Sequence, residues 1–146
     1  MEYISTRGKA AAVSAAEAIV QGIADDGGLF VPASIPAYFP ADLAKLDYRS
    51  LAKAVFALYL TDFTAEEIAQ IVDEAYSAAS FPNGAVGTVS LDNTEILELW
   101  HGPTSAFKDM ALQVLPRLLV KSLAKTGGNK EIIILVATSG DTGTAA

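Results

Sequence analysis

The sequence contains no cysteine and a single histidine, His101. Without cysteine the chain can form no disulfide framework, no thiolate nucleophile and no cysteine-ligated zinc site. One histidine offers little for histidine ligation, so we expect no bound metal ion. Disulfides are typical of oxidising compartments, and their absence favours an intracellular protein.

Basic residues are also scarce. The 146 residues include 10 Lys and Arg against 17 Asp and Glu, which gives a net charge of −7. The charges are scattered along the chain rather than clustered. Proteins that bind nucleic-acid phosphates usually carry a basic patch, so we expect no nucleic-acid partner.

Long apolar runs are absent as well. No run approaches the roughly 18 residues of a membrane span, so we expect no membrane association. The alanine-rich stretch at 10–24 has some features of a secretory signal, but Ser14, Glu17 and Gln21 interrupt it and two aspartates follow it. We therefore expect a cytoplasmic protein.

The apolar residues that the sequence does contain, 51% of the total, suffice for one globular core. Two capping-box patterns, S-x-x-E at Ser14 and T-x-x-E at Thr64, predict helix starts. After Thr64, apolar residues recur at helical intervals and form one stripe. The helices predicted in this part of the chain cover residues 15–22, 50–60 and 65–79.

The last third of the sequence has a different pattern. Residues 86–91 and 95–99 are predicted to form two short strands separated by a turn. A long helix follows and ends at Gly127, and Pro116 inside it predicts a kink or an early break. The predicted buried face of this helix holds Met110, Ala111, Val114, Leu115, Leu118 and Leu119. The apolar, mostly β-branched run Ile132–Val136 then predicts a central parallel strand covered on both faces.

These elements predict an α/β protein with two parts. Residues 1–85 form a small, mainly helical N-terminal domain, and residues 86–146 form the incomplete beginning of a sheet-based domain. Helix 105–127 and strand 132–136 should pack against each other. Because a central strand followed by a helix that has barely begun is half of a β-α-β arrangement, we expect the N-terminal part of a longer protein. We also expect self-association through the uncovered strand face.

The polar turn after this strand is a candidate binding site. In open α/β sheets, ligands bind beyond the carboxyl ends of strands, where backbone N–H groups and a helix start attract anions. The hydroxyls of Thr138, Ser139 and Thr142 could hold a carboxylate or a phosphate, and Asp141 could cap the next helix. The alternative is a helix-capping turn with no ligand.

Lys108, in the first turn of the predicted long helix, is the second candidate. Lysine is favoured at the opposite end of a helix. The positive local potential and partial burial between Phe107 and Met110 would favour the neutral amine that a Schiff base requires. The alternative is an exposed lysine at a helix end. Asp109 is interpreted as a partner of the helix dipole rather than a catalytic acid, and His101 as part of a turn-stabilising hydrogen bond.

These two segments resemble a known family. Residues 97–109, LELWHGPTSAFKD, and residues 137–143, ATSGDTG, closely resemble the threonine synthase family of pyridoxal-phosphate enzymes, in the tryptophan-synthase-β fold group. Two earlier segments, YISTR at 3–7 and DGGLFVP at 26–32, agree with the resemblance. The resemblance spans the whole chain, and it implies that residues 86–146 begin a tryptophan-synthase-β-like pyridoxal-phosphate domain.

The resemblance also implies a reaction. The family converts O-phosphohomoserine and water to threonine and phosphate by elimination followed by hydration at the β-carbon. Lys108 falls on the lysine that forms the internal aldimine with pyridoxal phosphate and then serves as acid and base. The loop that grips the substrate α-carboxylate corresponds to Thr138, Ser139, Gly140, Asp141 and Thr142. The family's phosphate-binding loop lies downstream of Ala146, so we expect this chain alone to be inactive.

Two other functions stay open. A threonine-synthase-like phospholyase would keep the scaffold and Lys108 but release 2-oxobutyrate instead of threonine. A non-catalytic domain would bind a small anion or another subunit and use Lys108 only as a surface charge.

Overall fold

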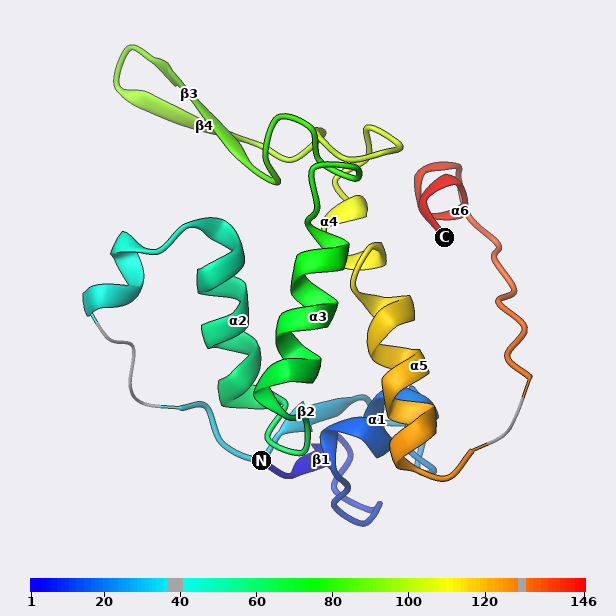
Figure 1. Ribbon diagram of the computed structural model, residues 1–146. Coiled ribbons are helices and arrows are strands. Elements are labelled where there is room, and N and C mark those ends of the chain that lie inside the picture. Colours follow the sequence, from blue (N-terminus) through cyan, green and yellow to red (C-terminus); the bar gives the residue numbers. More distant parts are fainter. Residues whose placement is uncertain (37–40, 129–130) are drawn as a thin grey trace.

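The computed structural model describes residues 1–36, 41–128 and 131–146, and places helices between two small antiparallel sheets (Figure 1). The helices are α1 (Ala15–Gln21), α2 (Tyr48–Tyr59), α3 (Ala65–Ala75), α4 (Asp109–Leu112), α5 (Leu115–Lys125) and α6 (Asp141–Ala145), with a 3₁₀ turn at Ala41–Lys45. Strand β1 (Tyr3–Ser5) pairs with β2 (Phe30–Pro32), and β3 (Gly87–Leu91) pairs with β4 (Thr94–Glu98). The mixed α/β class is therefore confirmed.

Both predicted capping boxes are present. The Ser14 hydroxyl accepts a hydrogen bond from the Glu17 N–H, and the Glu17 carboxylate accepts one from the Ser14 N–H. Thr64 and Glu67 make the same reciprocal pair at the start of α3. These bonds satisfy N–H groups that a helix start leaves without partners, which explains why local sequence fixes these two starts. Helix α3 ends at Ala75, earlier than the predicted end at residue 79.

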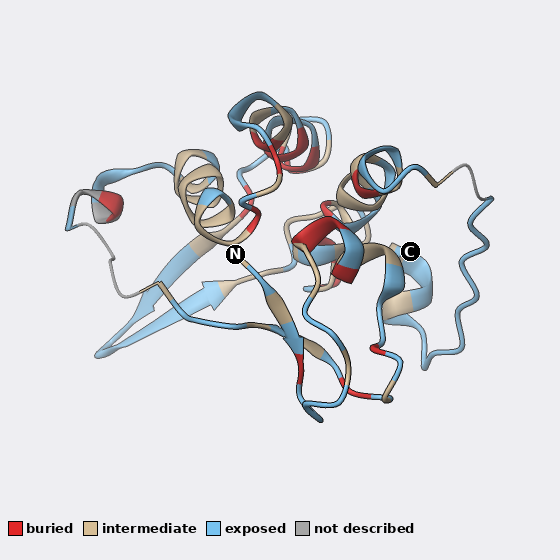
Figure 2. Cartoon of the chain, turned by 90° about the horizontal axis from the view of Figure 1, so that it is seen from below, coloured by how far each residue is buried: buried red, intermediate tan, exposed pale blue. Residues whose placement is uncertain are grey.

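The core lies where α1, α3 and α5 meet, as the buried positions in Figure 2 indicate. The predicted stripe on α3 is buried, with Ile71 and Val72 at its centre. Helix α1 presents the small residues Ala15 and Ala16, which allow α5 to approach closely. Burial of each large apolar side chain contributes about 1.5–3 kcal/mol, so this cluster stabilises the helical part.

Pro116 breaks the predicted long helix in two. Helix α4 ends at Leu112, and α5 begins at Leu115 with Pro116 in its first turn, where a missing N–H costs little. The predicted early break is confirmed. Val114 is buried as predicted, but Leu115 is 47% exposed, because the break interrupts the continuous face that the helical periodicity assumed.

Helix α5 packs against α1 and α3, and Val114 belongs to the same core cluster as residues of those helices. The core of the helical part therefore includes residues from beyond position 85. The division into domains at 1–85 and 86–146 stays a prediction. The described part of the chain holds no helix with the length and apolar character that a membrane crossing requires.

The predicted hairpin is present, with Val89 opposite Ile96 and a two-residue turn. Asp92 in that turn has φ of 51°, a left-handed conformation that Asp tolerates better than most residues. Strand β4 ends at Glu98, and the chain then enters the loop that carries Lys108.

The predicted strand at Ile132–Val136 is not formed, which corrects the sequence prediction. The segment is extended and swings away from α5 in Figure 1, with Ile133 83% and Leu135 94% exposed. A strand forms through hydrogen bonds to a neighbouring strand, and the described residues place none beside this segment. The predicted packing of this strand against helix 105–127 is wrong for the same reason.

Candidate functional site

The loop between β4 and α4 has a tight, internally bonded shape. Ser105 has φ of 58°, and its N–H donates to the Gly102 carbonyl at 3.2 Å. The Asp109 N–H donates to the Ala106 carbonyl at 3.0 Å, so the loop leads directly into the first turn of α4. This loop carries Lys108 at the position just before α4.

Asp109 is completely buried and bonds back to the loop. Its two carboxylate oxygens accept hydrogen bonds from the Thr104 N–H at 2.8 Å and from the Thr104 hydroxyl at 2.9 Å. Asp109 does lie in the first turn of α4, as a partner of the helix dipole would. However, the structure gives its carboxylate a further role that the sequence did not indicate, because it joins the start of α4 to the middle of the loop.

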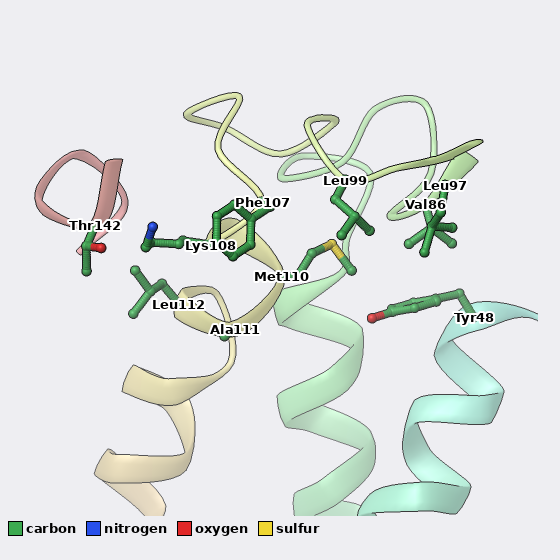
Figure 3. A pocket seen from close by; sticks show the side chains of 10 residues that line it. All are labelled: Tyr48, Val86, Leu97, Leu99, Phe107, Lys108, Met110, Ala111, Leu112 and Thr142. Carbon is green, nitrogen blue, oxygen red and sulfur yellow. The ribbon is translucent and has the colours of Figure 1, made fainter. Parts of the chain in front are cut away.

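The Lys108 side chain lies at the edge of a cavity. The residue is half-buried, and its Nζ lies 4.4 Å from the centroid of the Phe107 ring. Figure 3 shows the amine pointing toward Thr142, which comes from α6. A cation this close to an aromatic face gains about 0.5–1 kcal/mol at an accessible site, which favours this direction of the side chain.

The cavity has a volume of about 570 Å³ and mostly apolar walls. Its walls come from α2, the β3–β4 region, the loop and α4, with Thr142 at the same end as Lys108 and Tyr48 at the opposite end (Figure 3). The lining residues are Tyr48, Val86, Leu97, Leu99, Phe107, Lys108, Met110, Ala111, Leu112 and Thr142. A flat organic ring fits such a space, and the amine and one hydroxyl are polar groups able to orient it.

Of the predicted turn, the structure brings Thr142 to the Lys108 cavity. Thr138, Ser139, Gly140 and Asp141 are not among the residues that line it. The Gly140 N–H lies 3.5 Å from the Thr138 hydroxyl oxygen. Asp141 does not cap α6 as predicted, because Gly140 occupies the cap position and no side chain bonds there.

His101 bonds to the end of the hairpin. Its Nε2 lies 2.8 Å from a carboxylate oxygen of Glu98, and both side chains are mostly shielded. The predicted turn-stabilising hydrogen bond of His101 is therefore confirmed. This pair fixes where the chain leaves β4 and so fixes the start of the Lys108 loop.

Two tyrosines near the cavity escaped the sequence analysis. The Tyr76 hydroxyl donates to the Met110 carbonyl at 2.8 Å, which ties the end of α3 to α4. The Tyr48 ring meets the Tyr76 ring edge-on at 4.9 Å, and Tyr48 lines the cavity. Burial, followed by hydrogen bonding to Tyr48, raises the pKa of the Tyr76 phenol above its ordinary value. No local pattern marks these residues, since the contacts join segments far apart in sequence.

The family model "Threonine synthase N terminus" matches residues 2–76. Threonine synthase of Pseudomonas aeruginosa is 43% identical over 152 residues, covering 100% of this chain and 32% of that protein. Threonine synthase of Schizosaccharomyces pombe is 37% identical, and the match covers 100% of this chain and 30% of that protein. Threonine synthase-like 2 of Mus musculus is 40% identical, and the match covers 100% of this chain and 31% of that protein.

Two solved structures have a similar fold. The PLP-bound threonine synthase from Brucella melitensis aligns with a TM-score of 0.79 and 36% identity, over 87% of this chain and 28% of that one. Threonine synthase from Escherichia coli aligns with a TM-score of 0.79 and 29% identity, over 99% of this chain and 33% of that one. This chain spans about a third of the length of the relatives that it matches.

Proposed function

Because this chain belongs to the threonine synthase family, we propose that it supplies the cofactor lysine and part of the substrate site of an enzyme that converts O-phosphohomoserine and water to threonine and phosphate. The observation that carries this proposal is the position of Lys108. Lys108 lines a cavity of about 570 Å³, and its amine points toward the hydroxyl-bearing Thr142, which lines the same cavity.

The residues around Lys108 fit one end of pyridoxal phosphate. A primary amine at an apolar cavity can hold the cofactor's aldehyde carbon, and the wall formed by Phe107, Met110 and Leu112 suits its ring. When bound, the cofactor supplies an electron sink for negative charge at the substrate α-carbon. The described residues that line the cavity include no glycine-rich cradle for the phosphate. We assign that contact to residues that the longer relatives have beyond this segment.

The residues of this chain then have distinct tasks. Lys108 Nζ would hold the cofactor, and its amine would serve as the acid and base that moves a proton at the substrate α- and β-carbons. The turn Thr138–Thr142 binds the substrate α-carboxylate, with the Thr142 hydroxyl nearest to the cavity. Phe107 orients the amine through its ring face. His101 and Glu98 anchor the loop that carries the lysine.

Borohydride trapping of added pyridoxal phosphate, followed by peptide mapping, tests this proposal. The experiment compares this chain with a polypeptide extended beyond Ala146 to the length of the relatives, with Lys108→Ala and Lys121→Ala variants of the longer protein as controls. We expect reduction selectively at Lys108 in the longer protein, loss of the label in Lys108→Ala and an unchanged label in Lys121→Ala. Label scattered over several lysines would contradict the assignment.

A phospholyase reaction is the second candidate function. The two reactions share the lysine and the substrate, and they differ in product. Threonine from O-phosphohomoserine supports the first proposal, whereas 2-oxobutyrate supports the second.

The non-catalytic alternative fits the geometry less well. A lysine that serves only as a surface charge would extend into solvent, whereas Lys108 is half-buried at the cavity and lies against Phe107. The trapping experiment also separates this alternative, because a surface lysine would be labelled no faster than the other exposed lysines.

A further inference from the structure

We propose that Asp109 is a positioning residue, whose buried carboxylate holds Thr104 and thereby fixes the loop that places Lys108 at the edge of the cavity. This inference rests on the proposed cofactor role of Lys108. It concerns a hydrogen-bonded clamp, in which Asp109 touches neither cofactor nor substrate.

The clamp consists of two hydrogen bonds between Asp109 and Thr104. Both Asp109 oxygens are occupied by Thr104, one by the N–H at 2.8 Å and one by the hydroxyl at 2.9 Å. Asp109 is fully shielded from solvent. Hydrogen bonds to a buried carboxylate are among the stronger ones in proteins, because water does not compete and the acceptor is charged.

Gly102 allows the clamp to close. A Cβ at this position would lie 2.5 Å from both Cβ and Oδ2 of Asp109, so any other residue would force the loop or Asp109 to move. The loop backbone therefore packs directly against the Asp109 side chain. Ser105 holds a left-handed conformation that is unfavourable for a residue with a side chain, and the two Thr104 bonds help to offset this cost.

The clamp acts on Lys108 through geometry and through charge. Lys108 precedes Asp109, and its carbonyl accepts from the N–H groups of Ala111 at 3.1 Å and Leu112 at 2.9 Å, so the start of α4 sets its backbone. The Asp109 carboxylate is turned toward Thr104, and Lys108 forms no ion pair with any described residue. Because the Asp109 carboxylate is bonded to Thr104, it forms no ion pair with the Lys108 amine, and the amine stays available to react.

Substitutions can show whether the hydrogen bonds of Asp109 or its negative charge matters for Lys108. Asp109→Asn keeps the shape and can keep both bonds, because its oxygen can accept from the Thr104 N–H while its NH₂ donates to the Thr104 hydroxyl. Asp109→Ala removes both bonds. Thr104→Val removes the hydroxyl bond alone, and Thr104→Ser retains it.

The experiment uses the polypeptide extended to the length of the relatives and measures the rate of pyridoxal-phosphate trapping at Lys108. We expect Asp109→Ala, which removes both hydrogen bonds, to slow trapping about tenfold or more. Thr104→Val removes only one of them and should slow trapping less. Asp109→Asn and Thr104→Ser should stay within about threefold of the unsubstituted protein. Equal rates for Asp109→Ala and the unsubstituted protein would overturn the proposal, as would an Asn variant as slow as the Ala variant.

Amide hydrogen exchange at Thr104, measured without cofactor, gives a second readout. We expect protection in the unsubstituted protein and in Asp109→Asn, and its loss in folded Asp109→Ala. Unprotected Thr104 in the unsubstituted protein refutes the clamp whatever the cofactor does. Protected Thr104 together with no trapping at Lys108 refutes the proposed function instead, and with it the clamp's role toward the cofactor. If Asp109→Ala does not fold, Thr104→Val against Thr104→Ser decides the same question.

Discussion

The hydroxyl of Ser5 donates to Oδ1 of Asp26 at 2.6 Å, and this bond joins the two N-terminal segments that resemble the threonine synthase family. The Asp26 carboxylate also accepts from the N–H groups of Lys9 and Gly28, each at 2.9 Å. The Arg7 guanidinium donates to the Asp26 carbonyl at 2.9 Å. The small β1–β2 sheet is thus held by Asp26 as well as by its own ladder.

Stability at acid pH should depend on Asp26. Hydrogen bonding from Ser5, followed by smaller contributions from backbone N–H groups, lowers the pKa of Asp26. Its contribution to stability is present above the unfolded-state pKa of about 3.9 and is lost as the pH falls through the lower folded-state value. Urea unfolding between about pH 5 and pH 2 should show a shallower decline for Asp26→Asn than for the unsubstituted chain. Parallel curves would contradict this account.

Gly28→Ala should destabilise the chain by about 1–3 kcal/mol, because the new Cβ would lie 2.0 Å from the Ser5 hydroxyl oxygen. The substitution forces Ser5 away from Asp26. Thermal unfolding of Gly28→Ala, Ser5→Ala and the double variant measures the coupling free energy between positions 28 and 5. Gly28→Ala should cost less in the Ser5→Ala background, and additive effects of the two substitutions would show that the clash lies elsewhere.

Tyr76→Phe should destabilise the chain by about 1–2 kcal/mol, because the partly buried Met110 carbonyl loses the donor that lies 2.8 Å away. Tyr59→Phe is a matched control, since its hydroxyl bonds to none of the described residues. Chemical denaturation of both variants tests the difference. Equal free energies of unfolding would mean that the Tyr76 hydroxyl contributes nothing net.

The isolated 146-residue chain should self-associate through Ile132–Val136. Leu135 is 94% exposed, and an apolar, β-branched segment that pairs with no other described strand is prone to pair with another chain. Light scattering over a concentration series should detect association, and Leu135→Lys should reduce it. A monodisperse monomer of the unsubstituted chain would contradict the prediction.

The same isolated chain should not turn over O-phosphohomoserine. A phosphate cradle is lacking among the described residues that line the Lys108 cavity. Each charge-assisted hydrogen bond to a phosphate contributes on the order of 1.5–3 kcal/mol, and several would be missing together. Phosphate release assayed with excess pyridoxal phosphate, beside the longer protein, tests this expectation. Turnover that is lost in Lys108→Ala would overturn it.

Local sequence determined the features that depend on neighbouring residues. The reciprocal bonds at Ser14 and Thr64 fix helix starts, Pro116 breaks a helix because it has no N–H, and the turn at Asp92 closes a hairpin. Each of these effects acts within about one helical turn or one hairpin. The motif around Lys108 also pointed to the residue that the structure places at the cavity.

Tertiary structure alone decided the rest. Hydropathy marked Ile132–Val136 as a strand, but a strand requires a neighbour, and periodicity cannot say which segment supplies one. Tyr48 reaches the cavity and Tyr76 reaches Met110 only because helices distant in sequence pack together. The Asp109 clamp depends on how the loop folds back onto its own helix. Contacts of this kind are set by packing in three dimensions, which no local pattern encodes.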